Sequence, residues 1–187
     1  MPFSFEETKI PGVKIITPRV FPDGRGVFFE SYKRSDFLKA GMDVDFVQDN
    51  HSKSSGGVVR GLHYQKNPNG QAKLLRAIAG TIYDVVVDIR KGSPAYGQWI
   101  GVELSAENCK MIFMPVGCAH GFAAISEHVE ILYKVSSEYC KAAEGGIVWN
   151  DESLGIDWRV KNPILSEKDS ILPSFSKADH NFIYKIS

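Results

Sequence analysis

The sequence lacks the features of a disulfide-bonded, secreted or membrane-spanning protein. Its 187 residues include three cysteines, Cys109, Cys118 and Cys140, and no CxxC pair. An odd number without that spacing argues against a disulfide framework and against a zinc site. Apolar runs reach only about five residues, whereas a transmembrane helix needs about 20. The N-terminus MPFSFEETKI has no basic segment followed by an apolar stretch, so we do not expect a signal peptide. These features indicate a cytoplasmic protein with no membrane partner.

An excess of charge of either sign is also missing. Lys plus Arg equals Asp plus Glu, at 22 each, so bulk charge does not attract the chain to nucleic acid. A small polyanionic ligand stays possible, but a few local arginines would have to hold it. We therefore expect no nucleic-acid partner.

Cofactor motifs are absent as well. The chain has no GxGxxG and no P-loop, so neither a bound dinucleotide nor an ATP-driven step is supported. It has no HxH or HExxH, and a metal-binding barrel would usually bring two or three histidines together. We expect no metal and no other cofactor. The five histidines are scattered along the chain, at His51, His63, His120, His128 and His180.

Helical signals are few. SDFLKAG predicts one short helix with Ser35 as its N-cap and Gly41 at its end, and SEKD, from Ser166 to Asp169, resembles a capping box. The rest consists of short β-branched and aromatic runs separated by Gly, Pro, Asn and Asp clusters. No repeat or linker divides the chain. We expect one all-β domain over residues 1–187, a sandwich or barrel with a few short helices.

Two segments show the alternation of strands with two distinct faces. In IYDVVVDIR, Tyr83 and every second residue share one face, while Asp84 and Asp88 share the other. In VEILYKVSSEY, Tyr133 and Tyr139 share a face and would lie roughly 20 Å apart if the strand stays regular.

His63, within RGLHYQ, is the strongest candidate for acid–base chemistry. An imidazole has an ordinary pKa of roughly 6.5, so it takes and returns a proton near neutrality; a half-buried strand histidine bonded to backbone is the alternative. The turn NPNG precedes Lys73, and we expect a hairpin that brings Lys73 back toward His63. A lysine there could hold a developing oxyanion, although an exposed strand end would explain it equally well.

Three further side chains could serve a ligand site. Tyr133 is either a core tyrosine with a bonded hydroxyl or a phenolic acid that faces a cavity. Arg25, between two glycines, suits an anion contact or a solvated turn. Arg60 would point away from His63 in a straight strand because their separation is odd, but Gly61 could mark a bulge that re-aims one of them.

Taken together, nine segments resemble the dTDP-4-dehydrorhamnose 3,5-epimerase family. They occur in the family's order and are spread over residues 20–173: DGRGVFFES, QDNHSKS, GVVRGLHYQ, QAKLL, IYDVVVDIRKGSPAYGQW, MPVGCAHGF, ILYKVSSEY, WNDESLGIDW and LSEKD. The resemblance implies a cupin-like β jelly roll and a homodimer. It implies that dTDP-4-dehydro-6-deoxy-D-glucose is inverted at C3 and C5 to dTDP-4-dehydro-L-rhamnose, without metal or nicotinamide, in dTDP-L-rhamnose biosynthesis.

This activity would give the candidate residues distinct roles. The C3 and C5 hydrogens flank the C4 ketone, so a base can remove each to form an enolate, and an acid on the opposite face completes inversion. The resemblance implies His63 as base, Tyr133 as acid and Lys73 as the group that stabilises the enolate oxygen. It implies that Asp169 orients His63, although Asp169 could instead only cap a helix.

The resemblance also implies residues that contact the ligand. Arg25 and Arg60 would hold the diphosphate through charge-assisted hydrogen bonds, and Tyr139 would stack on thymine. The other matching positions are Phe28, Glu30, Gln48, Asn50, Lys73, His120, Glu144 and Lys168. The sequence departs from the family at Cys118, where an aromatic residue is common.

Two alternatives remain at this stage. One is an epimerase of the same family that acts at a single carbon, in a pathway to another deoxysugar. The other is a cupin that binds a sugar nucleotide without catalysis or uses a metal. The set of His63, Lys73 and Tyr133 disfavours a pure binding protein, and the scattered histidines disfavour the metal enzyme.

Overall fold

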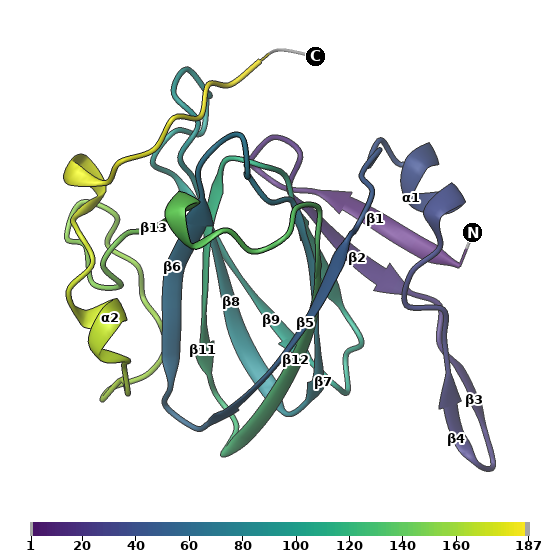
Figure 1. Ribbon diagram of the computed structural model, residues 1–187. Coiled ribbons are helices and arrows are strands. Elements are labelled where there is room, and N and C mark those ends of the chain that lie inside the picture. Colours follow the sequence, from purple (N-terminus) through teal and green to yellow (C-terminus); the bar gives the residue numbers. More distant parts are fainter. Residues whose placement is uncertain (1, 186–187) are drawn as a thin grey trace.

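The computed structural model describes residues 2–185 as two antiparallel β-sheets packed face to face, with short helices at the periphery (Figure 1). The six-stranded sheet contains, in spatial order, β1 (Phe3–Glu7), β2 (Lys14–Pro18), β10 (Met111–Met114), β7 (Lys73–Ala79), β12 (His128–Val135) and β5 (Gln48–Ser55). The five-stranded sheet contains β13 (Glu144–Gly146), β6 (Val59–Gln65), β11 (Cys118–Ala124), β8 (Thr81–Asp88) and β9 (Trp99–Ser105). The prediction of an all-β, jelly-roll-like sandwich is confirmed.

The smaller elements lie at the edges of this sandwich. A hairpin of β3 (Phe21–Asp23) and β4 (Gly26–Phe28) projects away from both sheets (Figure 1). The helices are α1 (Arg34–Lys39), α2 (Glu167–Ser170) and the 3-10 turns η1 (Lys141–Ala143) and η2 (Phe175–Lys177). Within residues 2–185, no helix has the length and apolar character needed to cross a membrane.

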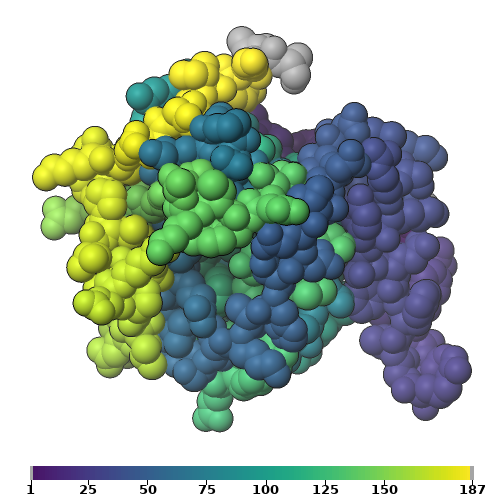
Figure 2. Space-filling view, in the orientation of Figure 1, coloured from purple at the N-terminus to yellow at the C-terminus, as the bar shows by residue number. Residues whose placement is uncertain are grey.

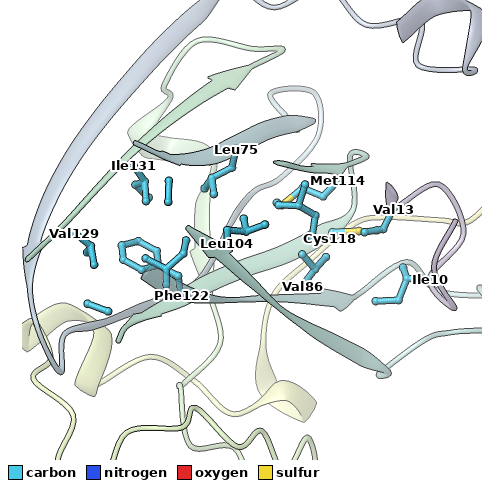
Figure 3. Packing of buried hydrophobic residues seen from close by; sticks show 14 of the residues in the cluster. Ile10, Val13, Leu75, Val86, Leu104, Met114, Cys118, Phe122, Val129 and Ile131 are labelled. Atoms are coloured by element: carbon cyan, nitrogen blue, oxygen red, sulfur yellow. The ribbon is translucent and has the colours of Figure 1, made fainter. Parts of the chain in front are cut away.

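The main core lies between the sheets. Leu75 and Ile131 of the six-stranded sheet meet Val86, Leu104 and Phe122 of the five-stranded sheet, and all five are at most 4% exposed (Figure 3). Burial of each such side chain stabilises the fold by about 1.5–3 kcal/mol relative to exposure. The two walls of the sandwich are therefore held in a fixed relation by apolar packing.

Strand β8 shows the predicted alternation, but both of its faces are buried. Val86 faces the core between the sheets, while Val85 and Val87 pack against a second apolar cluster. That cluster includes Trp158 and Phe182, because the C-terminal segment covers the outer face of the five-stranded sheet (Figure 1). This cover explains why the strand is rich in valine on both sides.

The two helix predictions had different outcomes. Ser166 is the N-cap of α2, and its hydroxyl oxygen accepts the backbone N–H of Asp169 at 3.0 Å, as predicted. The prediction of Ser35 as a cap is wrong, because Lys33 is the N-cap of α1 and makes no side-chain cap bond. Phe37 of α1 is 1% exposed and packs in the apolar cluster on the outer face of the six-stranded sheet, which anchors this helix.

The predicted hairpin between the His63 and Lys73 segments is also wrong. β6 pairs with β11 and β13, whereas β7 pairs with β10 and β12 in the other sheet. The connection therefore crosses from one wall of the sandwich to the other. Side-chain bonds hold the crossing, since the Gln65 amide donates to the carbonyls of Asn69 at 2.9 Å and Glu138 at 3.2 Å.

Candidate active site

A cavity with two lobes lies between the sheets, and both lobes are lined by His63, Lys73 and Tyr133. We call them the Tyr139 lobe, of about 190 Å³, and the Arg60 lobe, of about 170 Å³. The Tyr139 lobe is further lined by Gln48, Asn50, Tyr64, Gln65, Gln71, Tyr139 and Glu144. The Arg60 lobe is further lined by Ser52, Arg60, His120, Phe122 and Ile131.

His63 comes from β6 and is bonded to Asp169 of α2. Its Nε2 lies 2.7 Å from Asp169 Oδ1, and the backbone N–H of Gly61 donates to Oδ2 at 3.4 Å. Burial alone would raise the pKa of Asp169, but these bonds and the nearby imidazole outweigh it and hold that pKa below its ordinary value. Nδ1 is the ring nitrogen that Asp169 leaves unengaged.

Asp169 makes both of the contacts considered for it. Its backbone N–H is taken by the cap residue Ser166, which leaves the carboxylate for His63. The carboxylate side chain is 5% exposed. A buried carboxylate on one imidazole nitrogen fixes the tautomer and the orientation of the ring.

Tyr133 faces the cavity from the opposite wall. It lies on β12, where it is paired with Leu75 of β7 and Asn50 of β5, and it is half-buried. Burial raises the pKa of Tyr133, with the positive charge of Arg60 opposing part of that effect. The phenol therefore keeps its proton at neutral pH, the state that a proton donor needs.

Lys73 lies on β7 and is 8% exposed. Burial lowers its pKa to about 8, and the charge of Asp84 opposes this fall. The side chain is consequently still mostly an ammonium at pH 7, although it is close to titration. A cation in so dry a site interacts strongly with any negative charge that develops on a ligand.

The bulge suggested at Gly61 is present. Across the β6–β11 pair His63 lies opposite His120, and Arg60 lies opposite Phe122. The two β6 residues are three positions apart, whereas their two β11 partners are only two positions apart, so β6 contains one extra residue. This extra residue brings Arg60 and His63 into the same lobe despite their odd separation. Gly61 has φ +130°, and a Cβ there would lie 2.5 Å from the Cα of Gly121.

A second imidazole–carboxylate pair stands beside the first. His120 Nε2 lies 2.8 Å from Asp84 Oδ2, and Asp84 is fully buried. His63 and His120 are far apart in the sequence, but they are register partners on the adjacent strands β6 and β11. Each is bonded to its own carboxylate, and residues 2–185 hold no group of three His, Cys, Asp or Glu that could ligate a metal.

The rim of the Tyr139 lobe is a hydrogen-bonded network of predicted ligand residues. Gln48 accepts the backbone N–H of Tyr139 at 3.0 Å, and the Tyr139 hydroxyl donates to Glu144 at 3.2 Å. Lys168 of α2 forms an ion pair with Glu144, and the Gln48 amide donates to Asn50 at 2.8 Å. Burial acts to raise the pKa of Glu144, but its bonds to the lysine and tyrosine lower it overall. Polar groups at this rim can therefore bind the polar edges of a ligand.

Tyr139 reaches this rim by a different route from the one predicted. β12 ends at Val135 instead of continuing through Tyr139. The Gln71 amide donates to the carbonyl of Ser137 at 2.7 Å, and the Ser136 hydroxyl accepts the backbone N–H of Ala72 at 2.8 Å. The chain bends there, so Tyr139 lines the same lobe as Tyr133 rather than lying far along a strand.

Three predicted ligand residues are not at the cavity of their own chain. Arg25 and Phe28 belong to the projecting β3–β4 hairpin, which Figure 2 shows standing clear of the body, and Glu30 follows it. The Arg25 side chain is 91% exposed and bonds to Asp23 at the hairpin tip, with 2.6 Å between Nη2 and Oδ2. Phe28 is 67% exposed. The structure therefore does not bring these residues to His63.

Several residues in or beside the cavity were not predicted from the sequence. Asp84 is one; the available signal was a carboxylate on the inward face of an otherwise apolar strand. Ser52 has the same strand parity as Gln48 and Asn50, so it could have been found by extending that pattern. The other unpredicted lining residues are Tyr64, Gln65, Gln71, Phe122 and Ile131.

Comparison with known proteins identifies the family of this chain. The model of the dTDP-4-dehydrorhamnose 3,5-epimerase family matches residues 7–177. The chain belongs to this family. A dTDP-4-dehydrorhamnose 3,5-epimerase of Shigella flexneri is 51% identical over 175 residues, which are 93% of this chain and 97% of that protein.

Solved structures of the family have the same fold. The epimerase from Elizabethkingia anophelis NUHP1 superposes with a TM-score of 0.91 at 44% identity, covering 94% of this chain and 98% of that one. An epimerase from Legionella pneumophila, solved in complex with dTDP-4-keto-L-rhamnose, gives a TM-score of 0.91 at 41% identity and covers 95% of both chains. Family membership and fold are thus established for this epimerase homologue.

Proposed function

We propose that this chain converts dTDP-4-dehydro-6-deoxy-D-glucose to dTDP-4-dehydro-L-rhamnose, a step in the synthesis of dTDP-L-rhamnose. The observation that best supports this function is the placement of His63 and Tyr133 on opposite walls of one cavity, with Lys73 lining both lobes. A base and an acid on opposite faces of a sugar ring are what inversion of a carbon requires.

The chemistry needs only proton transfers. His63 removes a proton from the carbon next to the ketone, and the electron pair moves onto O4 to form an enolate. Lys73 stabilises the negative charge on O4, a contact of a kind worth about 3 kcal/mol. Tyr133 then gives its proton to the same carbon from the other face, and both side chains regain their starting states by exchange with water. The sugar is neither oxidised nor reduced, so no hydride carrier enters the balance.

The remaining cavity residues would bind the nucleotide portion of the substrate. With the sugar ring between His63 and Tyr133, the ligand would extend along the Tyr139 lobe, where Tyr139 offers an aromatic face for thymine. The polar rim described above supplies hydrogen bonds to the ligand. Arg60 brings a positive charge to the other lobe, where its guanidinium can bind an anionic group.

We further propose a homodimer in which the β3–β4 hairpin completes the partner's cavity. Val27 and Phe28 are 64% and 67% exposed on a two-stranded hairpin, an element that is marginally stable on its own. A second copy of the chain would bury this apolar surface. Arg25, Phe28 and Glu30 would then contact the ligand of the other subunit, which explains why they lie far from His63 in their own chain.

Mixing two inactive variants tests this arrangement. His63→Ala and Arg25→Ala chains are co-expressed with different affinity tags, and the mixed dimers are purified by both tags. A mixed dimer then holds one site with both defects and one intact site, so we expect about half of the wild-type activity per dimer in a symmetric assembly. If the hairpin served its own subunit, mixed dimers would show only the average of the two parents, and the proposed exchange would be wrong.

Deuterium labelling tests the reaction itself. In deuterated water the wild-type protein is expected to label both C3 and C5 of the sugar, as followed by NMR. His63→Ala should slow this labelling about 10²–10⁴-fold, the usual contribution of a general base. His128→Ala is the matched control, because His128 is exposed on the outer face and bonds to Glu130. Label at one carbon would indicate a single-carbon epimerase, and label at neither would refute the proposed function.

A further inference from the structure

The pair formed by His120 and Asp84 has an unbalanced hydrogen-bond pattern. Asp84 is fully buried and gives Oδ2 to His120, while its Oδ1 has no hydrogen-bond partner among residues 2–185. A buried carboxylate with an unpaired oxygen is costly unless a nearby positive charge compensates for it. A cation near Asp84 would supply that compensation.

Lys73 is the candidate on the facing sheet, because it lines the same lobe as His120, the bonded partner of Asp84. Burial lowers the pKa of Lys73 to about 8, and the attraction of Asp84 is the largest effect that opposes this fall. A smaller effect comes from Cys118, whose own pKa burial raises to about 12. That thiol is therefore neutral near pH 7, and Asp84 is left as the anion that acts on Lys73.

The other titratable or charged groups that line the same lobe cannot take this role. They are Arg60 and His63 on β6, His120 on β11 and Tyr133 on β12. Each is cationic or neutral near pH 7, so none of them attracts an ammonium as a carboxylate does. Two other carboxylates near the cavity are already engaged, Asp169 by His63 and Glu144 by Lys168 and Tyr139.

We propose that Asp84 is a positioning residue of the active site, which orients His120 and by its charge keeps Lys73 protonated where the enolate oxygen develops. The proposal rests on the proposed function, in which Lys73 stabilises that oxygen. It divides the two buried carboxylates between two tasks, with Asp169 serving the base and Asp84 serving the oxyanion site.

Asp84→Asn tests the proposal through the pH dependence of the reaction. Asparagine keeps the size of the side chain and an oxygen that can accept from His120, but it removes the charge. Lys73 should then lose its proton at lower pH, so the ratio of variant to wild-type kcat/KM should fall as pH rises. We expect the loss at pH 8.5 to exceed the loss at pH 6 by about 10-fold, the effect of lowering a pKa by about 1. An equal loss at every pH would indicate a merely structural role and overturn the proposal.

A second measurement requires no substrate. Lys73 is acetylated with acetic anhydride across the pH range, and the rate is read by mass spectrometry of its peptide. The midpoint should fall in Asp84→Asn and should not fall in His120→Gln, which keeps the carboxylate. An unchanged midpoint in Asp84→Asn refutes the proposal even if the protein epimerises the sugar. If the wild type does not label the sugar, the proposed function is wrong. The midpoint of Lys73 acetylation would still show whether Asp84 keeps Lys73 protonated.

Two further variants of Asp84 allow the same test if Asp84→Asn does not fold. Should Asp84→Asn not fold, Asp84→Ser removes the charge with a smaller side chain, and Asp84→Glu retains it. The Lys73 midpoint should be lower in the serine variant than in the glutamate variant. Equal midpoints in the two would overturn the proposal.

Discussion

Asp169→Asn separates two roles that one residue combines in this fold. Ser166 caps α2 by accepting the backbone N–H of Asp169. The Asp169 carboxylate bonds to His63 at 2.7 Å and accepts the backbone N–H of Gly61 at 3.4 Å. Asparagine keeps the backbone bond and changes only the carboxylate. Ser166→Ala makes the opposite change, because it removes the cap and leaves the carboxylate in place.

The expected loss follows from the lost charge. A hydrogen bond to a charged group contributes about 1.5–3 kcal/mol, and each 1.4 kcal/mol of transition-state stabilisation corresponds to about tenfold in rate. Asp169→Asn should therefore lower kcat/KM by about 10- to 150-fold, because the imidazolium that forms at His63 loses its anionic partner. Ser166→Ala should lower the free energy of unfolding by about 1 kcal/mol and change kcat/KM little.

Two measurements on the same preparations decide the matter. Deuterium incorporation at C3 and C5 gives the rate of proton removal, and denaturant unfolding gives the stability. Near-normal exchange in Asp169→Asn would show that His63 does not depend on the carboxylate. If Ser166→Ala slowed exchange as much as Asp169→Asn, the helix rather than the carboxylate would be what matters.

Two further predictions concern the acid and the packing of the bulge. Tyr133→Phe should reduce inversion more than hydrogen exchange, because His63 can still remove a proton and return one to the same face; equal loss of both, measured by NMR, would contradict the acid role. Gly121→Ala should lower the free energy of unfolding by about 1–3 kcal/mol, because its Cβ would lie 2.7 Å from the carbonyl oxygen of Arg60 and 2.9 Å from Trp158. Gly24→Ala is the control, since a Cβ there meets nothing within 4 Å, and similar thermal unfolding of the two variants would refute the packing explanation.

Features that depend on neighbouring residues could be predicted from the sequence. Strand parity identified the two faces of β8, and the odd separation of Arg60 and His63 pointed to the bulge that the structure contains. The Ser166 cap could likewise be predicted, because its hydrogen bond joins residues only three positions apart. The fold class followed from many short strands, and the candidate site from the resemblance of several segments to one family.

Features that depend on distant residues could not be predicted. The turn before Lys73 looks like a hairpin locally, yet the partners of β6 and β7 are strands far along the chain in two different sheets. The end of β12 is set in the same way, because the side chain of Gln71 bonds to the carbonyl of Ser137, 66 residues away. The contact of Asp84 with His120 could not be predicted, because it forms between β8 and β11, whose residues are 36 positions apart in the sequence.

His63 and Tyr133 stand on different layers, and the gap between these layers is set by side chains such as Leu75, Val86 and Leu104 that never reach the cavity (Figure 3). The configuration of the product would therefore depend on how the apolar interior spaces the two sheets. A smaller side chain there would leave a cavity into which the two walls can partly relax. Delivery of a proton by Tyr133 would suffer before its removal by His63, so such an interior substitution would be detected as hydrogen exchange without inversion.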